Sequence, residues 1–308
     1  MIFGVFCGLS AAILNSAGYV FGARFLLNYK SALRLTVVSS LVMMALSLPL
    51  MLFLFPYGKL PRPGEFLLLI PVWIFAYWLG QGSFFMTLKY FNASCLASLL
   101  GLKIVLLALF FMLFTNKNPS VWQWIAVLLA TGAAISFNWS GAKLTSAAGI
   151  FFLLATLIGY CMCDIYETKI IQGVMECGYP LMRASVTGAS IIYSALGICS
   201  IPFLFFLKLS RKQVVYAAPN GVLWIASQVM LMACFALLLP VFANVILATR
   251  GIFSVLLGVL LAAFGLSKFD SHISRAQWIK RGISAIAMIV AIAVYSLAEA
   301  GVLKSWNW

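Results

Sequence analysis

The chain has 308 residues, of which 64% are hydrophobic and only 8% are charged. A soluble domain needs a largely polar surface, so this composition excludes a water-soluble protein and indicates a membrane protein. The formal charge of +14 comes from 20 basic and 6 acidic residues. Most of the basic residues lie in short connectors between apolar runs, where anchoring to lipid headgroups is the usual reason, so no nucleic-acid partner is expected.

Ten apolar runs follow one another along the chain, each about 20 residues long, which is the length needed to cross a hydrocarbon core. Connectors rich in Pro, Gly, Ser and charge separate them, as in YGKLPRPGE and LSRKQ. We therefore expect an all-α membrane protein with ten transmembrane helices. The predicted spans are 2–23, 35–55, 66–88, 93–115, 120–139, 147–168, 183–207, 215–238, 241–265 and 277–298.

The two halves of the chain resemble each other. An offset of 145 residues aligns GVFCGLSAAILNSAGYVFGARF with GIFFLLATLIGYCMCDIYETKI, and an offset of 147 pairs Gln81 with Gln228 and Lys103 with Arg250. Because five crossings turn the second copy upside down, the repeats are expected to be inverted, which is typical of secondary transporters. The predicted five-helix repeats, which together form one membrane domain, are residues 1–142 and 143–308.

Lys103 and Arg250 are the cations that fall well inside apolar runs. A charge at the centre of a membrane helix costs roughly 2.5 to 3.5 kcal/mol on insertion scales, so such residues are usually functional. Their shared repeat position predicts that they lie close together, and a bound anion between them would relieve their repulsion. Arg offers a planar fork of donors to such an anion, and Lys a point charge. Two alternatives stay open: an ion pair with Asp164 or Glu167, and bracing of helix ends.

Other polar and aromatic residues in the apolar runs are candidates for contacts with a substrate. Each amide can both donate and accept a hydrogen bond, although hydrogen bonding between helices is an equally good explanation for any one of them. Asp164 and Glu167 are also candidates for carrying a coupling proton, if burial raises the pKa of either carboxyl group. The candidate lining residues are Gln81, Gln228, Asn15, Asn244 and Tyr19.

Three segments carry a family resemblance: GLSAAILNSAGYVFGARFL at 8–26, FFMTLKYFNASCLASLLGLK at 84–103, and ANVILATRGIFSVLLGVLLAAFG at 243–265. With them the chain resembles the drug/metabolite transporter superfamily in its ten-helix form, which has two EamA-type five-helix units. The resemblance implies a secondary carrier. In the similar phosphate-translocator branch, basic residues in the fourth and ninth helices grip phosphate. That branch often has a Lys-Arg pair in the ninth helix, where this chain has Thr249 and Arg250.

An intramembrane enzyme is the first alternative class, but the sequence lacks the catalytic residues and motifs that such an enzyme needs. The single histidine, His272, lies in a polar connector, and neither HExxH nor GxSxG occurs. Cys161 and Cys163 form CxC without a matching histidine cluster, so no metal site is expected. No nucleotide-binding loop is present in the sequence either. The sequence therefore predicts a protein that is not an enzyme and has no cofactor.

The expected function is transport of a small polar metabolite by alternating access, with an organic anion, including a phosphorylated one, as the expected substrate. Export of amphipathic compounds or amino acids, with structural internal cations, is the alternative. The expected partners are the substrate and membrane lipid, a homodimer is compatible with the sequence, and the expected location is the bacterial plasma (inner) membrane. Twelve basic residues in the odd-numbered connectors against six on the other face place both termini outside. Relatives usually have both in the cytoplasm, so orientation stays open.

Overall fold

The computed structural model describes residues 1–60, 62–87, 90–91, 96, 99–115, 119–138, 146–263 and 275–302. All regular elements of these residues are helices. His272 and part of the fourth predicted span lie outside the described residues. The helices are α1 (Ile2–Tyr29), α2 (Ala32–Leu54), α3 (Pro63–Thr87), α5 (Leu102–Thr115), α6 (Val121–Asn138), α7 (Ala147–Glu176), α8 (Leu181–Ser200), α9 (Phe203–Phe206), α10 (Arg211–Leu237), α11 (Pro240–Leu247), α12 (Arg250–Ala263) and α13 (Arg275–Glu299).

Within the described residues, seven helices are long and apolar enough to cross a bilayer. Three shorter apolar helical stretches, Leu102–Leu113, Val121–Phe137 and Pro240–Ser254, fall in the fourth, fifth and ninth predicted spans. Large apolar side chains such as Phe53 and Phe205 are almost fully exposed. An apolar surface of this kind needs a hydrocarbon solvent. The all-α membrane class is thus supported, whereas the count of ten crossings stays a prediction.

The chain divides into two compact units, each built from both halves of the sequence. The α1–α10 unit comprises Ile2–Phe75 and Asp164–Leu237. The α6–α13 unit comprises Met1, Ala76–Cys163 and Leu238–Trp308. The helices α3 and α7 each contribute one end to each unit. The predicted repeat boundary near residue 142 therefore lies inside a compact unit, and the repeats themselves stay a prediction.

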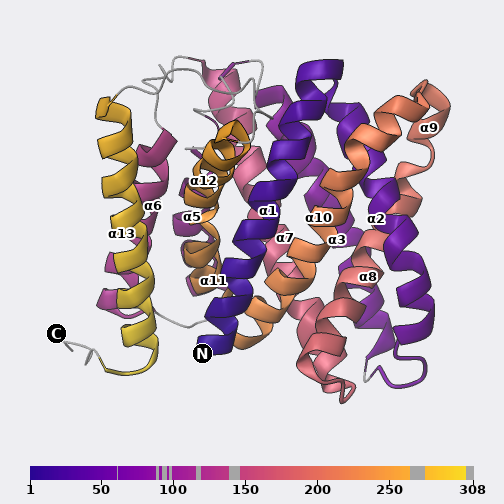
Figure 1. Cartoon of the computed structure of the whole chain (residues 1–308). Coiled ribbons are helices and arrows are strands. Elements are labelled where there is room, and N and C mark those ends of the chain that lie inside the picture. The colour runs from indigo at the N-terminus through magenta and orange to yellow at the C-terminus, as the bar shows by residue number, and fades with distance from the viewer. Residues whose placement is uncertain are drawn as a thin grey trace. The chain divides into compact units, whose positions relative to one another are not determined.

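In the α1–α10 unit, α1 packs along α10, and α2 packs along α8 and α10 (Figure 1). Side-chain hydrogen bonds connect the first pair: Ser227 Oγ donates to the Ala11 carbonyl at 2.8 Å, and Asn220 Nδ2 donates to the Gly18 carbonyl at 2.8 Å. Lipid gives little hydrophobic drive for helices to associate, so small residues and polar contacts of this kind hold such interfaces.

In the α6–α13 unit, α6 packs along α13 (Figure 1). The hydroxyl groups of Ser136 and Ser284 lie 2.7 Å apart between these helices. The Phe242 ring of α11 stacks on the Tyr295 ring of α13, with centroids 4.5 Å apart and planes 9° from parallel. These contacts fix α11 and α6 on one common partner, α13.

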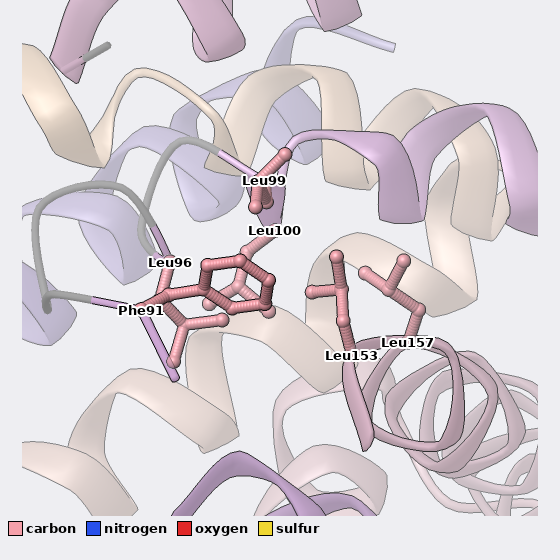
Figure 2. Packing of buried hydrophobic residues seen from close by; sticks show 6 residues of the cluster. All are labelled: Phe91, Leu96, Leu99, Leu100, Leu153 and Leu157. Carbon is pink, nitrogen blue, oxygen red and sulfur yellow. The ribbon is translucent and has the colours of Figure 1, made fainter. Parts of the chain in front are cut away.

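A leucine-rich cluster in the α6–α13 unit joins α7 to the turn that precedes α5 (Figure 2). Leu153 and Leu157 are one turn apart on α7 and therefore project from one face, and Leu99 and Leu100 pack against them. The packing holds the start of α5, which carries Lys103. The buried members are Phe91, Leu96, Leu99, Leu100, Leu153 and Leu157.

Candidate functional site

The described part of the predicted ninth span, 241–263, contains a turn and forms two helices, α11 and α12. A turn at Ala248 and Thr249 separates α11 from α12. The Thr249 hydroxyl donates to the Ile246 carbonyl at 2.7 Å, and the Thr249 N–H donates to the same oxygen at 3.0 Å. A hydroxyl that competes for a helical carbonyl, together with bonds spanning three residues, tightens and bends the backbone.

Both internal cations lie in the first turn of the helix that follows such a turn. Arg250 is the first residue of α12, and Lys103 is the second residue of α5, after a turn at Leu100 and Gly101. The Lys103 N–H donates to the Leu100 carbonyl at 3.1 Å, a bond that also spans three residues. Each cation thus stands in the first turn of a helix, where the N–H groups of Ile104 and Gly251 already donate to carbonyls of the preceding turn.

Two contacts of Lys103 come from the helix α7. The ammonium group of Lys103 lies 6.0 Å from the centre of the Tyr160 ring, within reach of a cation–π attraction. The Cys161 thiol donates to the Lys103 carbonyl at 3.6 Å. Both residues follow directly on the leucine face of α7 that packs before α5. Lys103 is therefore positioned by tertiary packing rather than by its own helix alone.

Gln81 joins the same group through a hydrogen bond from the Tyr160 hydroxyl to Gln81 Oε1, 2.8 Å long. The bond depends on a close crossing of α3 and α7 at two glycines. A Cβ atom on Gly159 would lie 2.5 Å from the nitrogen and 2.6 Å from the Cα of Gly80. No side chain fits there, so the crossing requires glycine. It connects Gln81, Tyr160 and Lys103 into one polar group.

The side chain of Asn244 forms a hydrogen bond within its own helix, α11. Its side-chain Nδ2 donates to the Pro240 carbonyl at 2.9 Å, and the side chain is buried. The Ala248 N–H donates to the Asn244 carbonyl at 3.0 Å, at the end of α11. The recorded contacts of Asn244 thus stabilise the segment that leads to the interruption, and its role in binding substrate stays a prediction.

A second polar group lies on facing surfaces of α1 and α10. Asn15 and Tyr19 are one turn apart on α1, Trp224 and Gln228 are one turn apart on α10, and the Tyr19 and Trp224 rings meet edge to face at 5.7 Å. Asn15 and Gln228 are 3% and 7% exposed. Among the described residues, no partner is found for the buried atoms Asn15 Oδ1, Gln228 Oε1 and Trp224 Nε1. Such atoms carry a desolvation cost until something binds them.

Asp164 and Glu167 are both buried in the α1–α10 unit, with 5% and 4% exposure. Glu167 Oε1 accepts a hydrogen bond from Trp73 Nε1 at 3.1 Å. The Trp73 ring in turn meets the Tyr193 ring edge to face at 5.5 Å. The carboxyl group of Glu167 is thus held by an aromatic pair, and an ion pair of either acid with Lys103 stays a prediction.

An apolar groove of about 550 Å³ lies along α1 and α10. Its lining carries no charged side chain, so it suits lipid chains better than an organic anion. The lining residues are Phe21, Val215, Ala218, Pro219, Val222 and Leu223.

The candidates named from the sequence divide between the two units. Lys103, Arg250, Gln81 and Asn244 lie in the α6–α13 unit, whereas Asn15, Tyr19, Gln228, Asp164 and Glu167 lie in the α1–α10 unit. The close approach of Lys103 to Arg250 stays a prediction.

Sequence reasoning missed Tyr160 and Trp224. The repeat offsets were a signal that could have found them, because the offset of 145 pairs Tyr160 with Asn15, and the offset of 147 pairs Trp224 with Tyr77.

Long apolar helices with polar groups buried between them are typical of membrane transporters. Residues 2–139 match the EamA-like transporter family. The resemblance predicted from the sequence is thus supported over these residues, and the match together with the apolar helices indicates an integral membrane protein. Members of the EamA family are transporters, which supports the expectation that this protein is not an enzyme.

Among 28 matching chains of known structure, one titled "Crystal structure of protein" is similar over 98% of this chain and 99% of its own, with a TM-score of 0.65. At 13% sequence identity, it shows a shared fold alone. No curated protein matches the chain.

Proposed function

We propose that this protein is a secondary transporter that moves a small organic anion across the membrane by alternating access. The observation that carries the proposal is the placement of Lys103 and Arg250, each in the first turn of a helix that follows a tight turn. Half-helix N-termini near the midplane bind anionic groups in other secondary transporters. The positive charge of Lys103 or Arg250 in such a first turn would itself attract an anion.

The proposal includes ten crossings in two inverted repeats. Supporting it, Ser47 of α2 and Ser194 of α8 are 147 residues apart, which is the repeat offset, and their hydroxyl groups lie 2.9 Å apart. Equivalent residues meet in this way near the two-fold axis that relates inverted repeats. The family match also ends at residue 139, close to the proposed repeat boundary at 142.

Glu167 is the proposed site of a coupling proton, with Asp164 as the second candidate. Its carboxyl group is buried inside a predicted transmembrane helix and accepts a hydrogen bond from Trp73. Buried carboxyl groups of this kind form proton relays in pumps and transporters. Glu167→Gln should then preserve exchange of substrate while abolishing its dependence on a proton gradient.

Export of amphipathic compounds or amino acids is the second candidate function. It is favoured by the Tyr160 ring, which lies 6.0 Å from the Lys103 ammonium group and gives this cation an internal partner and hence a structural role. Under either function, the proposed location is the bacterial plasma (inner) membrane, and membrane lipid is the proposed surrounding partner. A homodimer stays a prediction.

Exchange in liposomes tests the anion proposal. The purified protein is reconstituted, and uptake of labelled phosphate is measured against internal organic phosphates and carboxylates, for wild type, Lys103→Gln and Arg250→Gln. We expect exchange with wild type and at least a tenfold loss in both variants, because loss of a charge-assisted hydrogen bond costs about 1.5 to 3 kcal/mol.

Lys169→Gln is the matched control, since Lys169 is an exposed cation on α7 whose ammonium lies 5.5 Å from the Tyr166 ring. Exchange by the control should equal that of wild type. Anion exchange that survives in Lys103→Gln and Arg250→Gln would rule out the proposed site. A thermal-shift screen of the same variants in detergent would then favour the amphipath exporter if only cationic or neutral compounds stabilise them.

A further inference from the structure

We infer that Asn15, Trp224 and Gln228 form a second binding subsite, which takes an uncharged or zwitterionic polar group of a ligand. Among the described residues, the oxygens Asn15 Oδ1 and Gln228 Oε1 and the indole nitrogen Trp224 Nε1 are buried and have no hydrogen-bond partner. Native interiors rarely leave buried polar atoms unpaired, and exceptions of this kind point to a ligand or a functional role.

The three residues lie on surfaces that face each other. Asn220 of α10 donates to the Gly18 carbonyl of α1, and Ser227 of α10 donates to the Ala11 carbonyl. These two bonds fix an antiparallel register in which Asn15 lies opposite the turn of α10 that contains Trp224. Gln228 lies on the same face of α10, one turn after Trp224.

The equivalent pair of residues in the other compact unit shows what this arrangement lacks. The repeat offsets of 145 and 147 pair Asn15 with Tyr160 and Gln228 with Gln81. In the α6–α13 unit, the Tyr160 hydroxyl donates to Gln81 Oε1 at 2.8 Å. In the α1–α10 unit, the shorter Asn15 side chain stands where the tyrosine would be, and Gln228 Oε1 has no partner among the described residues. The glutamine of the α6–α13 unit therefore has a hydrogen-bond partner, and the glutamine of the α1–α10 unit is left for a ligand.

The chemistry of the three atoms defines the ligand class. Two amide groups and one indole N–H match a small group that both donates and accepts hydrogen bonds, such as the ammonium and carboxylate of an amino acid or a hydroxyl group. No charged side chain belongs to the set, so a bare anion gains little from it. The subsite thus differs in chemistry from the one around Lys103 and Arg250.

The stability of variants tests whether these amides hold the fold. The full-length protein in detergent is compared with Asn15→Leu, Gln228→Met and the control Asn220→Leu. Asn220 is a buried amide on α10, like Gln228, but its hydrogen bonds are satisfied. It accepts from Ser39 Oγ at 2.8 Å and donates to the Gly18 carbonyl. We expect the control to lower Tm. Asn15→Leu and Gln228→Met should keep or raise Tm, because functional sites carry polar groups that cost stability.

Ligand binding is then read from the same thermal shifts, with L-serine as the probe and N,N,N-trimethylglycine as its counterpart without an N–H or O–H donor. L-serine should raise the Tm of wild type, and trimethylglycine should not. In Asn15→Leu and Gln228→Met, the same rise in Tm should need an L-serine concentration at least tenfold higher. Lys169→Gln, which changes an exposed cation of α7, should keep the response to L-serine.

Three results would overturn the inference. The first is a fall in Tm of both variants as large as that of Asn220→Leu, because the amides would then be structural. The second is no response of wild type to L-serine, as expected if the subsite holds only water. The third is an unchanged response in the variants. The anion proposal is tested separately, by phosphate exchange in Lys103→Gln. Its failure would therefore not change the interpretation of the thermal shifts with L-serine.

Discussion

Cys177 lies one residue beyond the C-terminal end of α7, where its thiol donates to the Gly173 carbonyl at 3.3 Å. Burial raises the pKa of this thiol, the Glu176 carboxylate raises it further, and Lys59 partly opposes both. The reactive form is the thiolate, so alkylation of Cys177 should rise with pH through a pKa above that of an ordinary thiol.

Glu176→Gln should therefore speed the alkylation of Cys177 by a maleimide at a fixed pH near 8, because removal of the carboxylate lowers the thiol pKa. Lys59→Gln should slow it, because it removes the charge that favours the thiolate. The measurement needs a background in which the exposed Cys199 and also Cys95 are replaced by serine. Equal rates in the two variants would show that burial alone sets the pKa.

Tyr160 contributes a hydroxyl group and an aromatic ring to different neighbours. Tyr160→Phe removes the hydrogen bond to Gln81 and keeps the ring beside Lys103. We expect a loss of about 1 kcal/mol in the free energy of unfolding, measured as a fall in Tm. Tyr166→Phe on the same helix is the control and should leave Tm unchanged. A Tyr160→Phe variant as stable as wild type would show that the hydroxyl contributes nothing.

At the scale of elements, the crossing of α3 and α7 depends on two glycines rather than on hydrophobic burial. Gly159→Ala would put a Cβ atom 2.5 Å from the Gly80 nitrogen and 2.8 Å from the Ala76 carbonyl oxygen. Backbone atoms cannot turn aside as a side chain can, so the two helices must separate. We expect a loss of about 1 to 3 kcal/mol in stability, together with loss of transport, because Gln81 and Tyr160 move apart.

Gly82→Ala is the matched control for this crossing, since a Cβ atom there meets no atom within 4 Å. It should retain both Tm and transport, because alanine favours the helix over glycine by about 1 kcal/mol. Melting temperatures and uptake by reconstituted protein measure both variants. Similar losses in Gly159→Ala and Gly82→Ala would point to a general need for glycine in these helices instead of a close crossing.

At the scale of the whole molecule, the proposed ten crossings have a consequence for the two termini. An even number of crossings places both termini on one side of the membrane. Epitope tags at the two ends should therefore become accessible together, either on intact cells or only after permeabilisation. Exposure on intact cells would agree with the bias of basic residues, and exposure after permeabilisation with the usual orientation of relatives. Tags on opposite sides would exclude ten crossings.

Much of the molecule follows from composition and from the lengths of apolar runs. The predicted span 277–298 nearly coincides with α13, Arg275–Glu299, and the span 35–55 with α2, Ala32–Leu54. The physical reason is local. A chain in hydrocarbon must satisfy its backbone hydrogen bonds within each segment, so an apolar run of sufficient length becomes a helix wherever it occurs. The family resemblance could also be recognised from the sequence, because the segments that carry it lie in these apolar runs.

The sequence by itself thus determined the membrane class, the approximate helix bounds and the two internal cations. Only the tertiary structure decided that the ninth span breaks at Thr249, that Tyr160 satisfies Gln81, and that Asn15 and Gln228 keep buried oxygens without partners among the described residues. Those outcomes depend on the rotation and register of one helix against another. Atoms far apart in sequence set that register, and no local pattern of residues records it.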